Sequence, residues 1–303
     1  MDEGADFRSW DELIPDALGL IFRNLSLQEV LTVVPRVCRS WRKVVMGPYC
    51  WLEIDIEEWS NRSEPENIDR MLRMLITRTS GSPRKLCVSE LQNDFIFSFI
   101  AEHAGSLQTL RLPRSDMSDA IVEQVAGRLS TVTFLDLSYC GKIGAPALKA
   151  IGSNCKLLAG LRRNMHPIDM DGKGSQADEA RAIAATMPNL KRLEIAYLLI
   201  DTDSIVEIIR SCQELEFLDL RGCWDVKLDD KYISDKFPKL KILGPQVIDH
   251  YETNNWDVCS DYTDSFYDTD SFDALWDDDD ESLELRFYEG FDEDPSYGWP
   301  PSP

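Results

Sequence analysis

The feature that most constrains the fold of this sequence is an apolar triplet, Leu-x-x-Leu-x-Leu in outline, which returns eight times at a nearly fixed interval. The triplets are Trp51/Ile54/Ile56, Pro83/Leu86/Val88, Leu107/Leu110/Leu112, Val132/Leu135/Leu137, Leu158/Leu161/Arg163, Leu190/Leu193/Ile195, Leu215/Leu218/Leu220 and Leu240/Leu243. Successive middle residues, with Leu243 as the last, lie 32, 24, 25, 26, 32, 25 and 25 residues apart. The last two apolar residues of a triplet flank one polar residue, which predicts a short strand with one buried face.

Stretches of helical period separate the triplets. Three of them place apolar residues on one helical stripe: Ile121, Val125 and Leu129; Leu148, Ile151 and Cys155; Ile205, Ile209 and Cys212. Each unit is therefore predicted to be a strand, a turn and a helix. The apolar faces of such a unit are covered only when the next unit stacks on them. The repeat thus predicts an α/β solenoid, which offers an extended surface rather than a catalytic pocket.

The repeat resembles the leucine-rich repeat in its cysteine-containing variety, because a cysteine follows the triplet at residues 132–140 and 215–223. The resemblance covers residues 51 to about 244. Arg163 departs from it, since a buried leucine is expected there. The unit from 161 to 193 also carries extra residues around HPIDMDGKGSQADE, which we predict to be a surface loop, because polar Gly-rich insertions are tolerated there at little entropic cost.

Residues 13–51 predict three short helices. The first begins near Pro15, and Ser26 with Glu29 forms a capping box for the second, which Pro35 interrupts. The third ends at Gly47-Pro48. Its apolar and aromatic residues are Val37, Cys38, Trp41, Val44 and Val45. A segment of this length cannot bury so much apolar surface within itself, so part of it must meet another surface.

This N-terminal segment resembles the F-box, the motif that docks substrate receptors onto the Skp-type adaptor of cullin-RING ubiquitin ligases. The resemblance is carried by Ile14-Pro15, Ile21-Phe22, Leu25, Val37-Cys38-Arg39, Trp41-Arg42 and the closing Trp51. The whole segment resembles in sequence the plant F-box/leucine-rich-repeat proteins of the Skp-interacting-partner type. A second interpretation, a helical cap on the first repeat, stays open beside it.

The resemblance implies a non-catalytic substrate-recognition subunit of an SCF (Skp-cullin-F-box) ubiquitin ligase, which presents a target for ubiquitination and proteasomal degradation. Its partners would be a Skp-type adaptor, through it the cullin and RING subunits, and an unidentified protein substrate; no cofactor or metal is expected. The residues expected to present or support the adaptor-binding surface are Ile14, Pro15, Leu18, Ile21, Phe22, Leu25, Val37, Cys38 and Trp41.

Substrate contact is expected at exposed strand positions that alternate with the buried leucines. The candidates are Asp55, Arg111, Asp136, Arg162, Glu194 and Asp219, with Ser138, Asn164 and Arg221 in the next row. Their mixed charge predicts a mixed-charge substrate patch, or a short degron held by a few ion pairs and an aromatic anchor.

The composition changes sharply near residue 250. Residues 251–303 hold 17 acidic residues against one basic residue, a net charge of −16, whereas the whole chain has −22. We therefore expect three parts: an F-box (8–52), repeats (51–246) and a disordered acidic, aromatic-containing tail (250–303). The tail is interpreted either as a solvating segment or as an interaction segment. An acidic tail after leucine-rich repeats also leaves an alternative, a freestanding interaction protein that binds basic nuclear partners such as histones.

Charge and apolar patterning argue against other classes. An acidic chain without a basic stripe lacks the electrostatic term that drives direct nucleic-acid binding, and no apolar run is long enough to predict a membrane span. The eight cysteines contain no C-x-x-C pair, which favours free thiols in a reducing compartment, the nucleus or the cytoplasm. The three histidines form no catalytic or metal-binding pattern, so an enzyme is not expected.

Overall fold

The structure is a computed structural model that describes residues 10, 13–166 and 175–246. The predicted acidic tail and most of the predicted insertion loop lie outside the described residues. The chain divides between Cys50 and Trp51 into two units, which we describe separately.

Residues 13–50 of the N-terminal unit contain four short helices rather than the three predicted. They are α1 (Pro15–Phe22), α2 (Leu27–Thr32), α3 (Val34–Val37) and α4 (Arg39–Met46). The capping box of α2 is confirmed, because the Ser26 backbone N–H donates to the Glu29 carboxylate at 2.9 Å and the Glu29 backbone N–H donates to Ser26 Oγ at 3.3 Å. Pro35 does not interrupt a helix but lies in the first turn of α3.

The predicted third helix begins later than the sequence suggested. Cys38 is extended, with φ −159° and ψ 169°, and its Sγ accepts a hydrogen bond from the Trp41 backbone N–H at 3.5 Å. It therefore caps α4 instead of lying within it, and Val37 belongs to the preceding turn. The predicted helix spanning both residues is wrong for this reason.

A small core holds these helices together. Leu18 and Phe22 of α1 are fully buried, and the Phe22 and Trp41 rings pack with centroids 5.0 Å apart. Gly19 allows α1 to approach the chain after α4, because a Cβ at this position would lie 2.6 Å from the Tyr49 carbonyl oxygen. Only a glycine permits that contact without displacing backbone.

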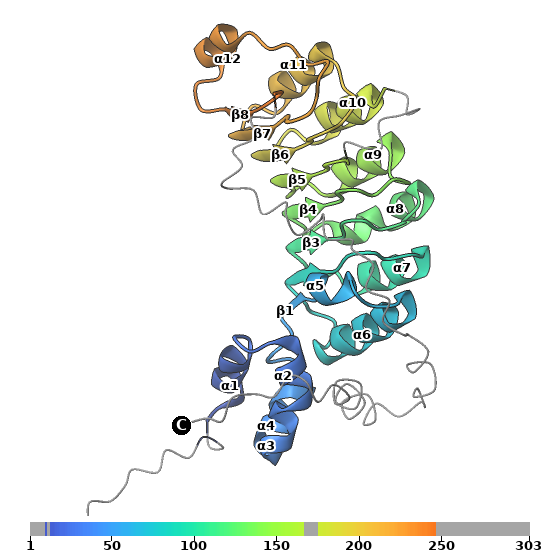
Figure 1. Cartoon of the computed structure of the whole chain (residues 1–303), viewed down its shortest axis with the longest axis vertical. Helices are drawn as coiled ribbons and strands as arrows, with labels where there is room; N and C mark the ends of the chain where they lie inside the picture. The colour runs from blue at the N-terminus through green and yellow to red at the C-terminus, as the bar shows by residue number, and fades with distance from the viewer. Residues whose placement is uncertain (1–9, 11–12, 167–174, 247–303) are drawn as a thin grey trace, which may run out of the picture. The chain divides into compact units, whose positions relative to one another are not determined.

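The second unit is a stack of strand and helix units around one parallel sheet, with strand order β1-β2-β3-β4-β5-β6-β7-β8 (Figure 1). The strands are β1 (Glu53–Asp55), β2 (Lys85–Cys87), β3 (Thr109–Arg111), β4 (Phe134–Asp136), β5 (Gly160–Arg162), β6 (Arg192–Glu194), β7 (Phe217–Asp219) and β8 (Lys241–Leu243). In Figure 1 the strands lie in one column, and helices α6 to α11 lie along one side of that column, at the right of the view.

The connecting helices follow the predicted units. They are α5 (Glu57–Ser60), α6 (Pro65–Arg78), α7 (Asp94–Glu102), α8 (Asp119–Val125), the 3-10 helix η2 (Ala126–Leu129), α9 (Ala145–Asn154), α10 (Ala177–Thr186), α11 (Thr202–Ser211) and α12 (Asp230–Lys236). Because α10 begins at Ala177, the predicted loop is wrong for its last residues, Asp178 and Glu179, which form the first helical turn.

The strand register confirms the middle residues of the first seven triplets. Ile54, Leu86, Leu110, Leu135, Leu161, Leu193 and Leu218 pair in sequence across the sheet, and all are buried. In the last unit Ile242, not Leu243, pairs with Leu218. That unit has one residue fewer between Leu240 and its strand, so the predicted marker was wrong by one position.

Buried thiols link neighbouring repeats. The Sγ atoms of Cys140, Cys212 and Cys223 donate hydrogen bonds to carbonyls of the preceding repeat at 3.2–3.3 Å. Burial raises the pKa of Cys87 and Cys223 to about 12, and of Cys140, Cys155 and Cys212 to about 11. These groups therefore stay protonated, as unreactive thiols, at neutral pH.

Thiol labelling should separate two kinds of cysteine. Among the seven cysteines in the part of the chain that the structure describes, all free, only Cys38 is not buried, so we expect a thiol reagent at pH 8 to label it and leave the other six intact. The readout is peptide mass spectrometry, with the urea-unfolded chain as the control in which all are labelled. Rapid labelling of Cys140 or Cys212 in the folded chain would contradict the burial.

The same thiols predict a loss of stability in alkali. Their folded pKa values lie above the unfolded value of about 9, so the unfolded chain loses these protons first as the pH rises. The stabilisation is complete below pH 9 and is lost progressively between about pH 9 and about pH 12. A urea titration at pH 8 and pH 10 should show a lower midpoint at pH 10, and serine variants at these positions should weaken that dependence.

The predicted fold class is thus confirmed: a helical N-terminal domain followed by an α/β leucine-rich-repeat solenoid. None of the described helices combines the length and the apolar character needed to cross a membrane.

Candidate adaptor and substrate surfaces

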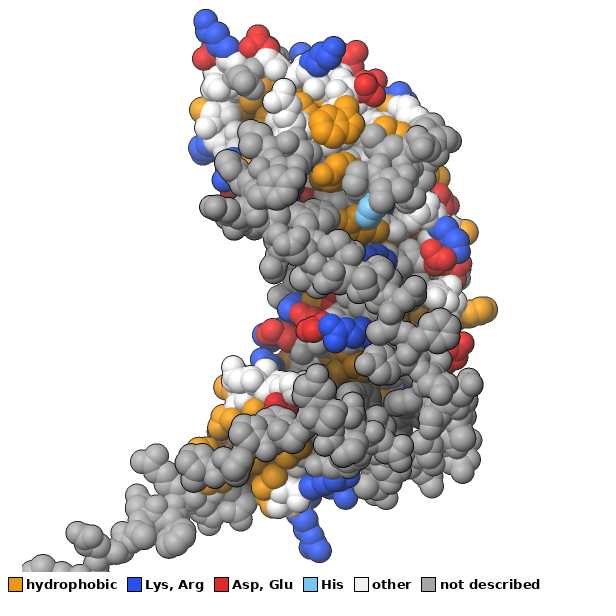
Figure 2. Space-filling model, in the orientation of Figure 1, with side chains coloured by type: hydrophobic (Ala, Val, Ile, Leu, Met, Phe, Trp, Pro, Cys, Tyr) orange, Lys and Arg blue, Asp and Glu red, His pale blue; other side chains and the backbone are white. Residues whose placement is uncertain are grey.

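The helices of the N-terminal unit leave an apolar surface exposed. Four of the predicted adaptor-binding residues lie on it, with exposed fractions of 65% for Ile14, 42% for Ile21, 39% for Leu25 and 54% for Val37. Figure 2 shows hydrophobic side chains gathered over these helices. So many exposed aliphatic residues in one small unit mark an interaction site.

The remaining predicted residues differ in exposure. Leu18 and Phe22 are buried and support the surface from below, Pro15 is exposed, and Cys38 and Trp41 are half-buried. Trp41 packs against Phe22, and its ring Nε1 lies 3.5 Å from the Trp10 carbonyl oxygen. The nine residues therefore divide into an outer set and a set that holds the helices in place.

Sequence reasoning missed several exposed apolar residues of this unit. They are Trp10, Leu13, Leu20, Val33 and Met46. Leu20 was detectable, because it lies two residues after buried Leu18 and therefore about 200° around the helix, on the opposite face. An apolar residue on that face of an amphipathic helix indicates a second contact.

We call the exposed residues Ile14, Leu20, Ile21, Leu25, Val33 and Val37 the apolar patch.

On the repeats, the predicted substrate row does align across the sheet. The register places Asp55, Arg111, Asp136, Arg162, Glu194 and Asp219 opposite one another, with Cys87 between the first two. The expectation that all are exposed is wrong for Asp136, Glu194 and Asp219, which are buried. Neighbouring arginine side chains cover them.

The covering arginines form a chain of ion pairs. Arg111 bonds Glu57 at 3.1 Å and Asp136 at 3.4 Å. Arg162 bonds Asp136 at 3.3 Å and also makes a two-pronged contact with Glu194 at 2.7 and 3.2 Å. Asp136 and the arginines on either side therefore share one network that crosses three strands.

The network continues on β6, where Arg192 donates to Glu194 at 2.6 Å. Arg221 forms its own pair with Asp219 of β7 at 2.7 Å. Burial alone would raise the pKa of Glu194, but hydrogen bonds from Arg162 and Arg192 outweigh it and lower that pKa. Despite burial, the carboxyl group stays ionised, and the pKa of Arg162 is raised by the same contacts.

The next predicted row is partly structural. Ser138 is buried, and its Oγ accepts the Asn164 backbone N–H at 3.3 Å. Asn164 Oδ1 accepts the Ala196 N–H at 2.9 Å, which links the segment after β5 to the following repeat. The expectation that Ser138 is exposed is therefore wrong, because it joins two repeats; Asn164 is half-buried, and Arg221 remains partly exposed.

Outward-facing residues before each middle leucine were missed. Phe134, Arg192 and Phe217 occupy these positions, and the Arg162 and Arg192 guanidinium carbons lie 5.9 and 4.2 Å from the Phe134 and Phe217 ring centroids. The alternation of a strand could have revealed them, since residues on both sides of a buried leucine point the same way.

Arg163 is the buried polar exception in the repeat. It is only 1% exposed, and its guanidinium reaches Glu179 at 3.2 Å and the carbonyls of Leu137 and Ile143 at 3.3 and 2.8 Å. Glu179 also accepts a hydrogen bond from Gln176. The leucine position is thus occupied by a paired charge, whose partner comes from the start of α10.

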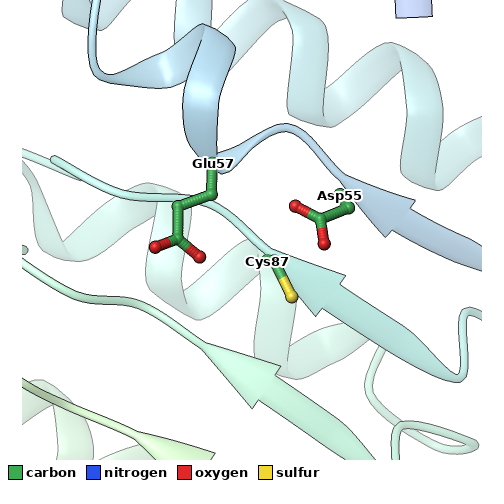
Figure 3. A group of neighbouring side chains, drawn as sticks. All are labelled: Asp55, Glu57 and Cys87. Carbon is green, nitrogen blue, oxygen red and sulfur yellow. The ribbon is translucent and has the colours of Figure 1, made fainter. Parts of the chain in front are cut away.

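A group of three potential metal ligands lies at the first two strands. Figure 3 shows Asp55 at the end of β1, Glu57 at the start of α5 and Cys87 on β2 turned toward one another. Lys85 pairs with Asp55 at 2.8 Å, Arg111 pairs with Glu57, and the Cys87 thiol is held protonated. A metal would have to displace both cations and a proton, so this donor set fits a metal poorly.

Exposed apolar residues on short helices, followed by a parallel repeat sheet, are typical of proteins that work by binding other proteins. The F-box domain model matches residues 10–53. The chain is 54% identical to the F-box protein FBW2 of Arabidopsis thaliana over 322 residues, covering all of both chains. It is 32% identical to the Arabidopsis F-box protein SKIP1, covering 80% of this chain and 86% of that one.

The chain therefore belongs to the plant F-box/leucine-rich-repeat proteins. A third relative, the putative F-box/LRR-repeat protein 23 of Arabidopsis, is 27% identical, covering 78% of this chain and 53% of that protein. F-box proteins are in general non-catalytic substrate receptors of SCF ligases, and their F-box implies binding of a Skp-type adaptor. The F-box match favours this role over the freestanding interaction protein considered above.

Proposed function

We propose that this chain docks on a Skp-type adaptor through the apolar patch and holds a protein substrate on its repeats for ubiquitination. The observation that carries the proposal is the set of exposed aliphatic side chains on the helices matched as an F-box. Cullin and RING subunits join through the adaptor and supply the ligase chemistry, so rate enhancement comes from proximity rather than from acid or base groups of this chain.

Substrate contact is proposed at the outward strand positions. Five of the predicted residues remain exposed or partly exposed there: Asp55, Arg111, Arg162, Asn164 and Arg221. The buried carboxylates Asp136, Glu194 and Asp219 would orient these arginines rather than touch the substrate. We also propose that the protein works in the nucleus or the cytoplasm, because buried thiols outside disulfides suit a reducing compartment.

Reconstitution tests the adaptor role. We expect the full-length chain, co-expressed with a plant Skp-type adaptor, to elute as a complex that then binds a cullin-RING pair. Size-exclusion chromatography with light scattering gives the composition. Elution of a folded chain apart from the adaptor at micromolar concentration would contradict the proposal.

A further inference from the structure

We propose that the strand face from β3 to β8 selects an extended acidic peptide segment with an aromatic anchor. By the strand face we mean the outward side chains of these strands: Thr109, Arg111, Phe134, Asp136, Arg162, Arg192, Glu194, Phe217, Asp219, Lys241 and Leu243, with Arg221 just beyond β7. This inference rests on the proposed function only in calling the bound segment a substrate; the binding itself can be measured without the ligase.

The charge that this face shows to solvent differs from the charge of the chain. The side chains of Asp136, Glu194 and Asp219 are 2%, 8% and 2% exposed, whereas those of Arg111, Arg162, Arg192 and Arg221 are 30%, 29%, 48% and 38% exposed. Lys241 is exposed as well. An otherwise acidic chain, with a net charge of −22, therefore presents guanidinium and ammonium groups here. That surface complements carboxylates.

Two half-buried rings give the face an apolar component. Phe134 lies over Gly160, where a Cβ would be 2.6 Å from the ring, so the absence of a side chain at Gly160 makes room for it. Arg192 stacks on Phe217 at 4.2 Å. Guanidinium groups held against aromatic rings and carboxylates lose little freedom when a ligand binds, and aromatic side chains are frequent anchors at interfaces.

The dimensions suit a short extended segment. Five strand spacings of about 4.8 Å give a path of roughly 24 Å, which about seven extended residues cover. Each guanidinium already shares its charge with a carboxylate, so the remaining field suits a few peptide carboxylates better than the dense charge of a phosphate or a nucleic acid, which needs unshared cations.

Peptide display on the full-length chain tests this directly. From random peptides of roughly 12 residues, long enough for the path above, we expect selection of sequences rich in Asp and Glu that also contain Phe, Tyr or Trp. For one selected peptide, replacing its aromatic residue by alanine should weaken binding about tenfold. Raising salt from about 0.1 to 1 M should also weaken it, because screening shortens the Debye length from about 10 to 3 Å.

A charge-matched pair of variants locates the site. R192Q/K241Q removes two cations from the strand face while Glu194 keeps Arg162 as its partner, and should weaken binding about tenfold or more. R128Q/K149Q removes two exposed cations from η2 and α9 and should change binding less than about twofold. Equal weakening by both pairs, selection of peptides without acidic residues, or preferential binding of single-stranded RNA at this face would overturn the inference.

The adaptor assay on the same preparations separates the two proposals. Adaptor binding with no preference for acidic peptides would contradict only the inference about the strand face. Binding of acidic peptides without binding of the adaptor would contradict only the proposed function.

Discussion

The variant I21E should abolish binding to a Skp-type adaptor while the protein stays folded. Ile21 is 42% exposed and lies in the apolar patch, so a carboxylate there is solvated in the free chain but buried without a partner in the complex. A carboxylate buried without a partner in an interface should weaken binding by about a hundredfold or more. Co-purification and calorimetric titration of the adaptor measure the effect.

Two controls make this prediction specific. F95E places the same carboxylate at an 81% exposed apolar residue of α7 and should leave adaptor affinity unchanged. Circular dichroism of I21E should match the unchanged chain, since Ile21 is not part of the core. A W41E variant, in contrast, should lose both adaptor binding and helical stability, because Trp41 packs on buried Phe22. Full adaptor binding by folded I21E would refute the proposed adaptor interface.

The variant R163A should be the most destabilising single change predicted in the repeats. It leaves Glu179 as a buried carboxylate without its cation and removes hydrogen bonds to the Leu137 and Ile143 carbonyls. Breaking a buried ion pair by removing one partner costs about 3–5 kcal/mol. Urea unfolding followed by circular dichroism gives the change in free energy, provided that the transition stays two-state.

Matched variants distinguish charge burial from simple loss of side-chain volume. R163L/E179L replaces the pair by the leucine that other repeats carry and should recover part of the loss. R181A, on the exposed face of the same helix that supplies Glu179, breaks the surface pair with Asp178 and should cost less than about 1 kcal/mol. A loss below about 1 kcal/mol in R163A would mean that the buried pair contributes little.

Much of the repeat fold was predictable because its periodicity is global. A leucine that must be buried at each turn of a solenoid fixes which strand residues pair, and seven of the eight predicted middle residues align in the structure. Only the shortened last unit shifted the marker to Ile242. In the N-terminal unit, by contrast, helix boundaries depend on single backbone conformations such as the extended Cys38, which the apolar pattern does not encode.

The burial of the strand-face carboxylates was not predictable from one strand at a time. Asp136 looks like an exposed alternating residue within Phe134–Asp136, and it is buried only because arginines from β3 and β5 close over it. The pairing of Arg163 was hidden similarly, since Glu179 is the last residue of the segment predicted to be a surface loop. Contacts between side chains of different repeats depend on lateral neighbours, whereas periodicity describes each strand alone.

The sharing of carboxylates between successive arginines has an evolutionary consequence. Arg162 contacts the acidic groups of both neighbouring strands, so replacing it alone removes a cation from two buried carboxyl groups at once, Asp136 and Glu194, which keep Arg111 and Arg192. Substitutions at adjoining repeats are then non-additive, and a changed residue is tolerated best when its neighbour changes too. In related proteins, we therefore expect the arginines and carboxylates of neighbouring strands to change in pairs rather than one at a time. The effect of a substitution in one repeat would then depend on the residue in the next.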